Sequence, residues 1–177
     1  MLLDIWLGGV WFHLFAALLC VMMAYEWTVI VHERSSSQFA LHAAAALCGV
    51  FLLRDVGIAA TLLAIASLAA FSAAIAQYQG RPITVWTYLG VFYCGLPAAA
   101  LVILRDDPAH GITAMIWLFV AIWAADILAY FAGRIIGGPK LWPAVSPKKT
   151  WAGLGGAVAG GALAGAGVAF WLGQTDI

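Results

Sequence analysis

The sequence predicts an all-α, polytopic membrane protein, a helix bundle that forms a single transmembrane domain over residues 1–177 with about six spanning helices. Composition gives the first reason, because 65% of the residues are hydrophobic, 9% are charged and the mean hydropathy is +1.00. Soluble domains carry roughly 25% charged residues, so this chain lacks the polar surface of a water-exposed globule. The second reason is the spacing of polar patches, which divide the chain into apolar runs of membrane-spanning length.

Six apolar runs follow one another along the chain. They cover residues 5–31, 39–53, 56–76, 83–104, 112–136 and 151–172. The second run is short for a full crossing, and Arg54 and Asp55 separate it from the third. Arg105-Asp106-Asp107-Pro108 ends the fourth run, because three charges and a proline cannot continue a helix in lipid.

Glycine and alanine dominate the sixth run. Gly156 and Gly160, like Gly161 and Gly165, are four residues apart and repeat the small-x-x-x-small spacing. Small residues let helix backbones approach closely in lipid, where packing drives association. The run therefore predicts a tightly packed helix rather than a phosphate loop, and the sequence contains no G-x-x-x-x-G-K-[ST] pattern.

Charge and metal-ligand patterns exclude several functions. Eight basic residues balance eight acidic ones, so no basic excess favours nucleic acid as a partner. The cysteines Cys20, Cys48 and Cys94 form no C-x-x-C pair, and the four histidines show no ligand spacing. Neither a disulfide framework nor a zinc site is expected.

The basic residues also predict an orientation. Alternating spans place Arg34, Arg81, Arg134, Lys140, Lys148 and Lys149 on one side, against Arg54 and Arg105 on the other. Six against two predicts that the loop Arg134–Thr150 is cytoplasmic and that both termini face outward. We expect a multi-pass protein of the cell inner membrane.

A polar stripe runs along the fifth predicted span. Asp126 lies near mid-membrane, and Tyr130, Gly133 and Arg134 follow on the same helical face. A carboxylate at that depth costs about 2.5–3.5 kcal/mol on insertion scales, so it should face a bundle interior or a wet cavity. The alternative is a structural acid hydrogen-bonded to a neighbouring helix.

The loop before the sixth span contains Ser146-Pro147-Lys148-Lys149-Thr150. Serine followed by proline is typical of a helix start, so we expect Ser146 to cap a helix with both lysines in its first turn. Free N–H groups and the helix dipole favour anions there, and two lysines would strengthen phosphate binding. The alternative is that the lysines only anchor the chain at the membrane surface.

Asp126-Ile-Leu-Ala-Tyr-Phe-Ala-Gly-Arg134, then Pro139-Lys-Leu and Val145-Ser-Pro-Lys-Lys-Thr-Trp-Ala-Gly153, closely resembles the bacterial phosphatidate cytidylyltransferases (CDP-diacylglycerol synthases). Their pattern is approximately D-T-G-A-Y-F-x-G-R, K-L and S-P-K-K-T-W-E-G. Weaker similarity at Gly8-Gly9, Glu26-Trp27 and Gly95-Leu96-Pro97 extends the resemblance over nearly the whole chain.

The resemblance implies transfer of a cytidylyl group from CTP to phosphatidic acid in the lipid bilayer, with Mg²⁺ neutralising phosphate charge. Its implied catalytic residues are Asp126 and Lys149, and its implied substrate-binding residues are Ser146, Lys148, Lys149, Thr150, Arg134 and Tyr130. The metal ligands are unknown, and Asp126 is the only candidate in this chain.

This sequence departs from the family pattern at two places, and each departure predicts an effect on activity. Ile127-Leu128 replaces Thr-Gly beside the acid, which removes a hydroxyl and narrows any cavity. The family's C-terminal signature with its acidic metal ligands does not occur, so we expect this chain alone to have little or no activity.

A non-catalytic scaffold or substrate-binding remnant, a homo-oligomer or a complementing chain remain alternatives. A small-solute transporter would require matching halves, and no internal repeat is found.

Overall fold

The computed structural model describes residues 8–174, and the chain folds into two compact units, Met1–Ala109 and His110–Ile177. By length and composition, five helices within the described residues could cross a membrane. Residues 5–7 of the first predicted span lie outside the described residues. The prediction of an all-helical membrane bundle is confirmed.

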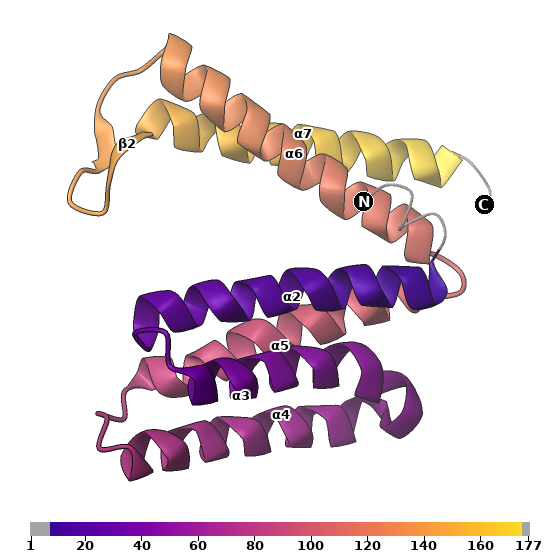
Figure 1. The fold of residues 1–177 in the computed structure, drawn as a ribbon. Coiled ribbons are helices and arrows are strands. Elements are labelled where there is room, and N and C mark those ends of the chain that lie inside the picture. The colour runs from indigo at the N-terminus through magenta and orange to yellow at the C-terminus, as the bar shows by residue number, and fades with distance from the viewer. Residues whose placement is uncertain (1–7, 175–177) are drawn as a thin grey trace. The chain divides into compact units, whose positions relative to one another are not determined.

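The first unit is a bundle of helices (Figure 1). Its elements are α2 (Gly9–Val31), α3 (Ser36–Leu47), the π-helical turn η1 (Cys48–Leu52), α4 (Leu53–Tyr78) and α5 (Val85–Asp106). Figure 1 shows α3 and α4 lying side by side as a helical hairpin. The second and third predicted spans correspond to its two arms.

One contact proves that the helical run from Ser36 to Tyr78 folds back on itself. The Gln38 side-chain amide donates a hydrogen bond of 3.0 Å to the Ser72 carbonyl oxygen, although 34 residues separate them. In a straight helix the two would lie about 51 Å apart. Gly57, with φ 81° and ψ 173°, breaks the helix near the bend, in a conformation that residues with a Cβ rarely adopt.

A buried polar network joins three helices of the first unit. The Ser72 hydroxyl of α4 lies 2.5 Å from Gln38 Oε1 of α3 and 3.3 Å from the Thr87 carbonyl oxygen of α5. His42 Nδ1 lies 2.5 Å from the Gln38 carbonyl oxygen. All four side chains are buried. These hydrogen bonds stabilise the unit because a polar group that is buried among apolar side chains without a partner costs free energy. No sequence motif marks this network, because its members are single residues far apart in the chain.

Contacts at the two ends of the first unit agree with the charge pattern. At one end Arg81 donates a hydrogen bond of 2.9 Å to the His32 carbonyl oxygen. At the other end His13 Nε2 lies 2.8 Å from Asp106 Oδ2, next to Phe51 with ring centroids 6.5 Å apart. The loops containing Arg34 and Arg81 therefore share one end of the unit, as the alternation of spans predicts.

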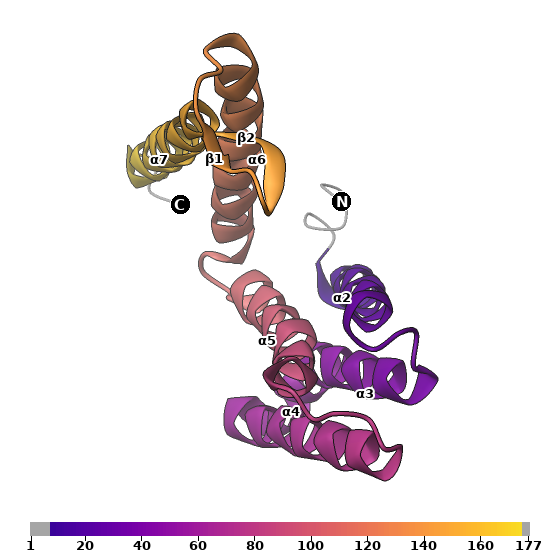
Figure 2. The same cartoon turned by 90° about the vertical axis from the view of Figure 1, so that its left-hand side faces the viewer.

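The second unit consists of two long helices joined by a small β-hairpin (Figure 2). Its elements are α6 (Gly111–Ile135), β1 (Lys140–Trp142), β2 (Ser146–Thr150) and α7 (Trp151–Gln174). The strands are antiparallel, with Lys140 opposite Thr150 and Trp142 opposite Ser146. Because the two intervals differ in length, a bulge lies between these pairs.

Small residues bring α6 and α7 into close contact. A Cβ added at Gly156 would lie 2.5 Å from the Leu128 carbonyl oxygen, and one at Gly160 would lie 2.6 Å from the Ala124 carbonyl oxygen. Further along, the Trp117 indole N–H donates a hydrogen bond of 2.9 Å to the Gly165 carbonyl oxygen. The prediction of a tightly packed glycine helix is confirmed, since only glycine permits this approach.

Candidate functional site

The predicted polar stripe on α6 is present in the second unit. Arg134 Nη1 donates a hydrogen bond of 2.8 Å to the Tyr130 hydroxyl, and its guanidinium carbon lies 5.9 Å from the centre of the Tyr130 ring. Both residues are exposed on the last two turns of the helix. The tyrosine therefore positions the guanidinium and leaves its remaining N–H groups available for an anion.

Asp126 lies on the same helix, nine residues before its end at Ile135. That interval corresponds to about 14 Å along the axis, close to half of a bilayer's hydrocarbon thickness. The residue is exposed, and no hydrogen bond or ion pair to it is found within residues 8–174. Since a carboxylate at membrane depth is costly without a polar partner, Asp126 is a candidate functional acid.

The predicted helix start at Ser146 is wrong. Residues Ser146–Thr150 form strand β2, and α7 begins at Trp151. The Gly153 backbone N–H donates a hydrogen bond of 3.1 Å to Thr150 Oγ1, so Thr150 occupies the capping position. Lys148 and Lys149 therefore lie on a strand ahead of the helix, and the first-turn dipole argument does not apply to them.

The reason for this shift is a tertiary contact around Thr150. Its side chain is buried, and a Cβ added at Gly133 would lie 3.2 Å from its hydroxyl oxygen. Gly153 also lies against α6, where an added Cβ would be 3.2 Å from the Ala129 carbonyl oxygen. Serine and threonine are both good caps, so local preference did not decide between them. The close crossing of the two helices favours Thr150.

The hairpin presents a concentrated positive charge. Lys140, Lys148 and Lys149 are all exposed, and Arg134 ends the preceding helix. No aspartate or glutamate occurs between residues 127 and 174. The segment therefore has four cations without a compensating acid, a composition that suits phosphate groups. Ser146 is half-buried where β2 follows the hairpin turn, opposite Trp142.

The described residues offer little for a metal ion. No cluster of three or more His, Cys, Asp or Glu side chains able to hold a metal is found within residues 8–174. Mg²⁺ is commonly bound through one or two carboxylates together with substrate phosphates and water. A single carboxylate such as Asp126 fits one position in that arrangement.

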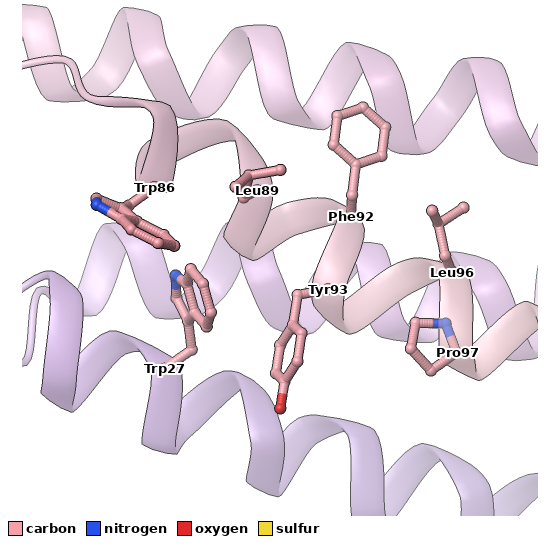
Figure 3. A pocket seen from close by; sticks show the side chains of 7 residues that line it. All are labelled: Trp27, Trp86, Leu89, Phe92, Tyr93, Leu96 and Pro97. Atoms are coloured by element: carbon pink, nitrogen blue, oxygen red, sulfur yellow. The ribbon is translucent and has the colours of Figure 1, made fainter. Parts of the chain in front are cut away.

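The first unit also contains an apolar groove that no sequence motif marks. It has a volume of about 460 Å³ and lies between α2 and α5 (Figure 3). Its lining consists of Trp27, Trp86, Leu89, Phe92, Tyr93, Leu96 and Pro97. Figure 3 shows Trp27 reaching from α2 toward α5, where its ring centroid lies 5.0 Å from that of Tyr93. A groove of this composition accommodates hydrocarbon rather than a phosphate.

Gly90 explains how the Trp27 side chain is accommodated. A Cβ added at Gly90 would collide with both Trp27 Nε1 and His42 Nε2. Both nitrogens are buried and lack a hydrogen-bond partner within the described residues. His42 Nδ1 donates to the Gln38 carbonyl oxygen, so Nε2 of the neutral ring is an acceptor. Glycine is the residue that leaves room for this approach.

Comparison with known proteins connects this geometry to a family. The model of the cytidylyltransferase family matches residues 1–176. A phosphatidate cytidylyltransferase of Brucella abortus is 42% identical over 164 residues, which are 89% of this chain and 60% of that protein. The protein of the same name from Pseudomonas aeruginosa is 33% identical over 166 residues, covering 86% of this chain and 59% of the relative.

This chain spans about 60% of the length of the curated relatives it matches. No solved structure matches it. The family match extends over both compact units and includes the Tyr130–Arg134 pair and the lysine-bearing hairpin. The chain therefore belongs to the cytidylyltransferase family.

Proposed function

We propose that this chain contributes the phosphate-binding segment and a membrane-embedded acid to a phosphatidate cytidylyltransferase. In that reaction an oxygen of the phosphatidate phosphate forms a bond to the α-phosphorus of CTP. The bond from that phosphorus to the bridging oxygen of the β-phosphate breaks, so CDP-diacylglycerol forms and diphosphate leaves. The observation that carries the proposal is the acid-free cationic segment formed by Arg134 and the hairpin lysines.

The charge and position of each residue determine its proposed role in phosphate binding. Phosphoryl chemistry needs mainly positioning and stabilisation of developing negative charge. Lys148 and Lys149, exposed on β2, would contact substrate phosphates, with Lys149 in the catalytic role. Arg134, oriented by Tyr130, would add a planar donor pair suited to a phosphate.

Ser146 and Thr150 have different surroundings. Ser146 is half-buried on the hairpin and can offer its hydroxyl to a substrate. The Thr150 hydroxyl already accepts a hydrogen bond from the Gly153 N–H, so it would hold the lysines in place by fixing the start of α7. Its hydroxyl hydrogen can still be donated to an oxygen of the substrate.

A bound Mg²⁺ would supply neutralisation of phosphate charge, and Asp126 would be one of its ligands. Asp126 is exposed on α6 and has no partner within the described residues, which leaves both carboxylate oxygens available. Its replacement by asparagine should reduce Mg²⁺ affinity, measured by titration with Mn²⁺ as a paramagnetic probe. If the Asp126→Asn variant bound Mn²⁺ with unchanged affinity, Asp126 would not be a ligand of the metal.

Binding of CTP and phosphatidate by the chain in nanodiscs tests the phosphate site. Lys148→Met with Lys149→Met keeps the aliphatic stems and removes both charges. Charge-assisted contacts contribute roughly 1–3 kcal/mol each, so binding of both ligands should weaken by about tenfold or more. Arginine at both positions should restore most of the affinity.

The control for this experiment is Arg54→Met, which removes a basic residue from the other predicted side of the membrane. Its binding should equal that of the parent. If the double methionine variant bound both ligands as tightly as the parent, the lysines would be membrane anchors only. We expect the chain alone to bind both substrates and to form little or no CDP-diacylglycerol, and robust Mg²⁺-dependent formation by the same preparation would contradict that expectation and exclude the non-catalytic alternative.

We also propose the orientation that the basic residues predict, with the hairpin cytoplasmic and both termini outside an inner membrane. Agreement between the contacts at each end of the first unit and the charge pattern supports it. A cysteine introduced at Ala144 should be protected from an impermeant reagent in intact cells and should react after lysis. Labelling of this cysteine in intact cells would show that the hairpin lies on the outer side and that the proposed orientation is wrong.

A further inference from the structure

The tip of the β-hairpin is apolar and exposed. It comprises Trp142, Pro143, Ala144 and Val145, which we call the hairpin tip. Trp142 is 65% exposed and Val145 is 73% exposed. The Val145 backbone N–H donates a hydrogen bond of 3.1 Å to the Trp142 carbonyl oxygen, so the turn is closed and presents these side chains outward. Contiguous apolar exposure of this kind marks a contact surface, whereas single exposed residues do not.

The position of the hairpin brings it to the membrane surface. It connects the end of α6 to the start of α7, and both helices are long and apolar enough to cross a bilayer. Only Ile136–Pro139 separate α6 from β1, and β2 runs directly into α7. Figure 1 shows the hairpin turned to one side of the helix ends instead of continuing along their axes. Both ends of this connection therefore lie near the level of the lipid headgroups, and the composition of the turn decides whether it enters the leaflet or the solvent.

Charge around the tip matches that layer. Lys140 precedes it, Lys148 and Lys149 follow it, and all three are exposed. No acidic residue occurs between residues 127 and 174 to oppose an anionic surface. Tryptophan favours the membrane interface, and lysines beside it reach lipid phosphates while their stems cover apolar surface.

From these observations we propose that the hairpin tip is an interfacial wedge that inserts into the leaflet on its own side, with the flanking lysines in its phosphate layer. Its partner is the anionic bilayer surface. The wedge keeps the cationic segment at the depth of lipid headgroups, where a phosphate on a lipid can reach it laterally. This inference depends on the spanning of α6 and α7 and does not rest on the proposed function.

Site-directed fluorescence measures the depth of the tip directly. In a chain with Cys20, Cys48 and Cys94 replaced by alanine, a single cysteine at Val145 would carry an NBD fluorophore. Nanodiscs would contain phosphatidylcholine alone or with phosphatidylglycerol, and lipids with a doxyl group near the headgroup would quench the fluorophore. Ala144→Cys repeats the measurement at a second exposed position.

The expected result is a blue-shifted NBD emission with loss of intensity to the doxyl lipid, larger when phosphatidylglycerol is present. The matched control is Gln79→Cys, an exposed residue in another short loop between long apolar helices, whose NBD emission should stay water-like and unquenched. Replacing Lys140, Lys148 and Lys149 by methionine should remove the increment due to phosphatidylglycerol.

Two results would overturn the proposal. A water-like emission at Val145 and Ala144 would mean that the tip projects into solvent. A blue-shifted emission without quenching by doxyl lipid would mean that protein, such as a second copy or another chain, covers the tip. Neither readout depends on enzymatic activity, so failure here leaves the proposed function to its own binding test.

Discussion

Substitution of Gly156 by alanine tests the close packing of α7 against α6. The new Cβ would lie 2.5 Å from the Leu128 carbonyl oxygen and 2.6 Å from the Ala132 Cβ. Ordinary contact begins at 3.4 Å, so α7 must retreat by 3.4 minus 2.5, or 0.9 Å. A gap of about 0.5–1 Å already removes a quarter to a half of the dispersion energy of each contact along the interface.

The magnitude follows from two opposing effects. Overpacking costs typically about 1–3 kcal/mol, whereas alanine in place of glycine stabilises a helix by roughly 0.5–1 kcal/mol. We therefore expect Gly156→Ala to lower the free energy of unfolding by about 1–2 kcal/mol. The matched control is Gly155→Ala, one residue earlier, where an added Cβ meets no atom within 4 Å. That variant should be as stable as the parent or slightly more stable.

Unfolding by SDS in mixed micelles, followed by tryptophan fluorescence, measures both variants under the same conditions. The emission is the sum over nine tryptophans, of which Trp117, hydrogen-bonded to the Gly165 carbonyl oxygen, lies at the contact of the two helices. Gly160→Ala provides a second test, since its Cβ would lie 2.6 Å from the Ala124 carbonyl oxygen. If Gly155→Ala and Gly156→Ala had equal stability, the close α6–α7 packing described here would be incorrect.

Three further predictions concern single contacts. Thr150→Ala should destabilise the chain by about 1 kcal/mol because Gly153 loses its cap, and Thr150→Ser should restore most of it in the SDS titration. Trp117→Phe should cost about 0.5–1.5 kcal/mol by removing the hydrogen bond to Gly165, and equal stability in the titration would contradict that bond. Burial, with smaller effects of His42 and Arg81, lowers the pKa of His32 from 6.5 to about 4. Folding therefore favours neutral His32. Its contribution to the free energy of unfolding is fully present above pH 6.5 and is lost as the pH falls toward 4, because the unfolded chain binds a proton that the folded chain does not. Unfolding measured at pH 7.5 and pH 5 should show this loss, and His32→Gln should reduce it.

Much of the candidate site can be predicted from the sequence because its residues are local. Asp126, Tyr130 and Arg134 are spaced by four, so any helix places them on one face, and the Arg134–Tyr130 hydrogen bond follows from that spacing. The hairpin lysines are adjacent in the chain, and their charge is uncompensated whatever the local fold. Their roles in catalysis and binding stay predictions.

The start of α7 shows where local rules are insufficient. Ser146 followed by Pro147 satisfies the preferences of a helix start as well as Thr150 followed by Trp151 does. The choice depends on the fit of Thr150 and Gly153 against Gly133, which belongs to a different helix. Contacts of this kind are invisible to capping preferences, because these consider only residues near the helix end.

The sequence by itself determined that the chain has helices apolar and long enough to cross a membrane and which of them packs closely, because apolar length and glycine spacing are properties of one segment. Only the tertiary structure decided that α7 begins at Trp151 and that Gln38 and Ser72 join the two arms of the hairpin over residues 36–78. It also decided that Trp27 shares a buried space with His42 beside Gly90. These depend on pairs of residues far apart in sequence, and their free energy of interaction exists only once the helices have packed.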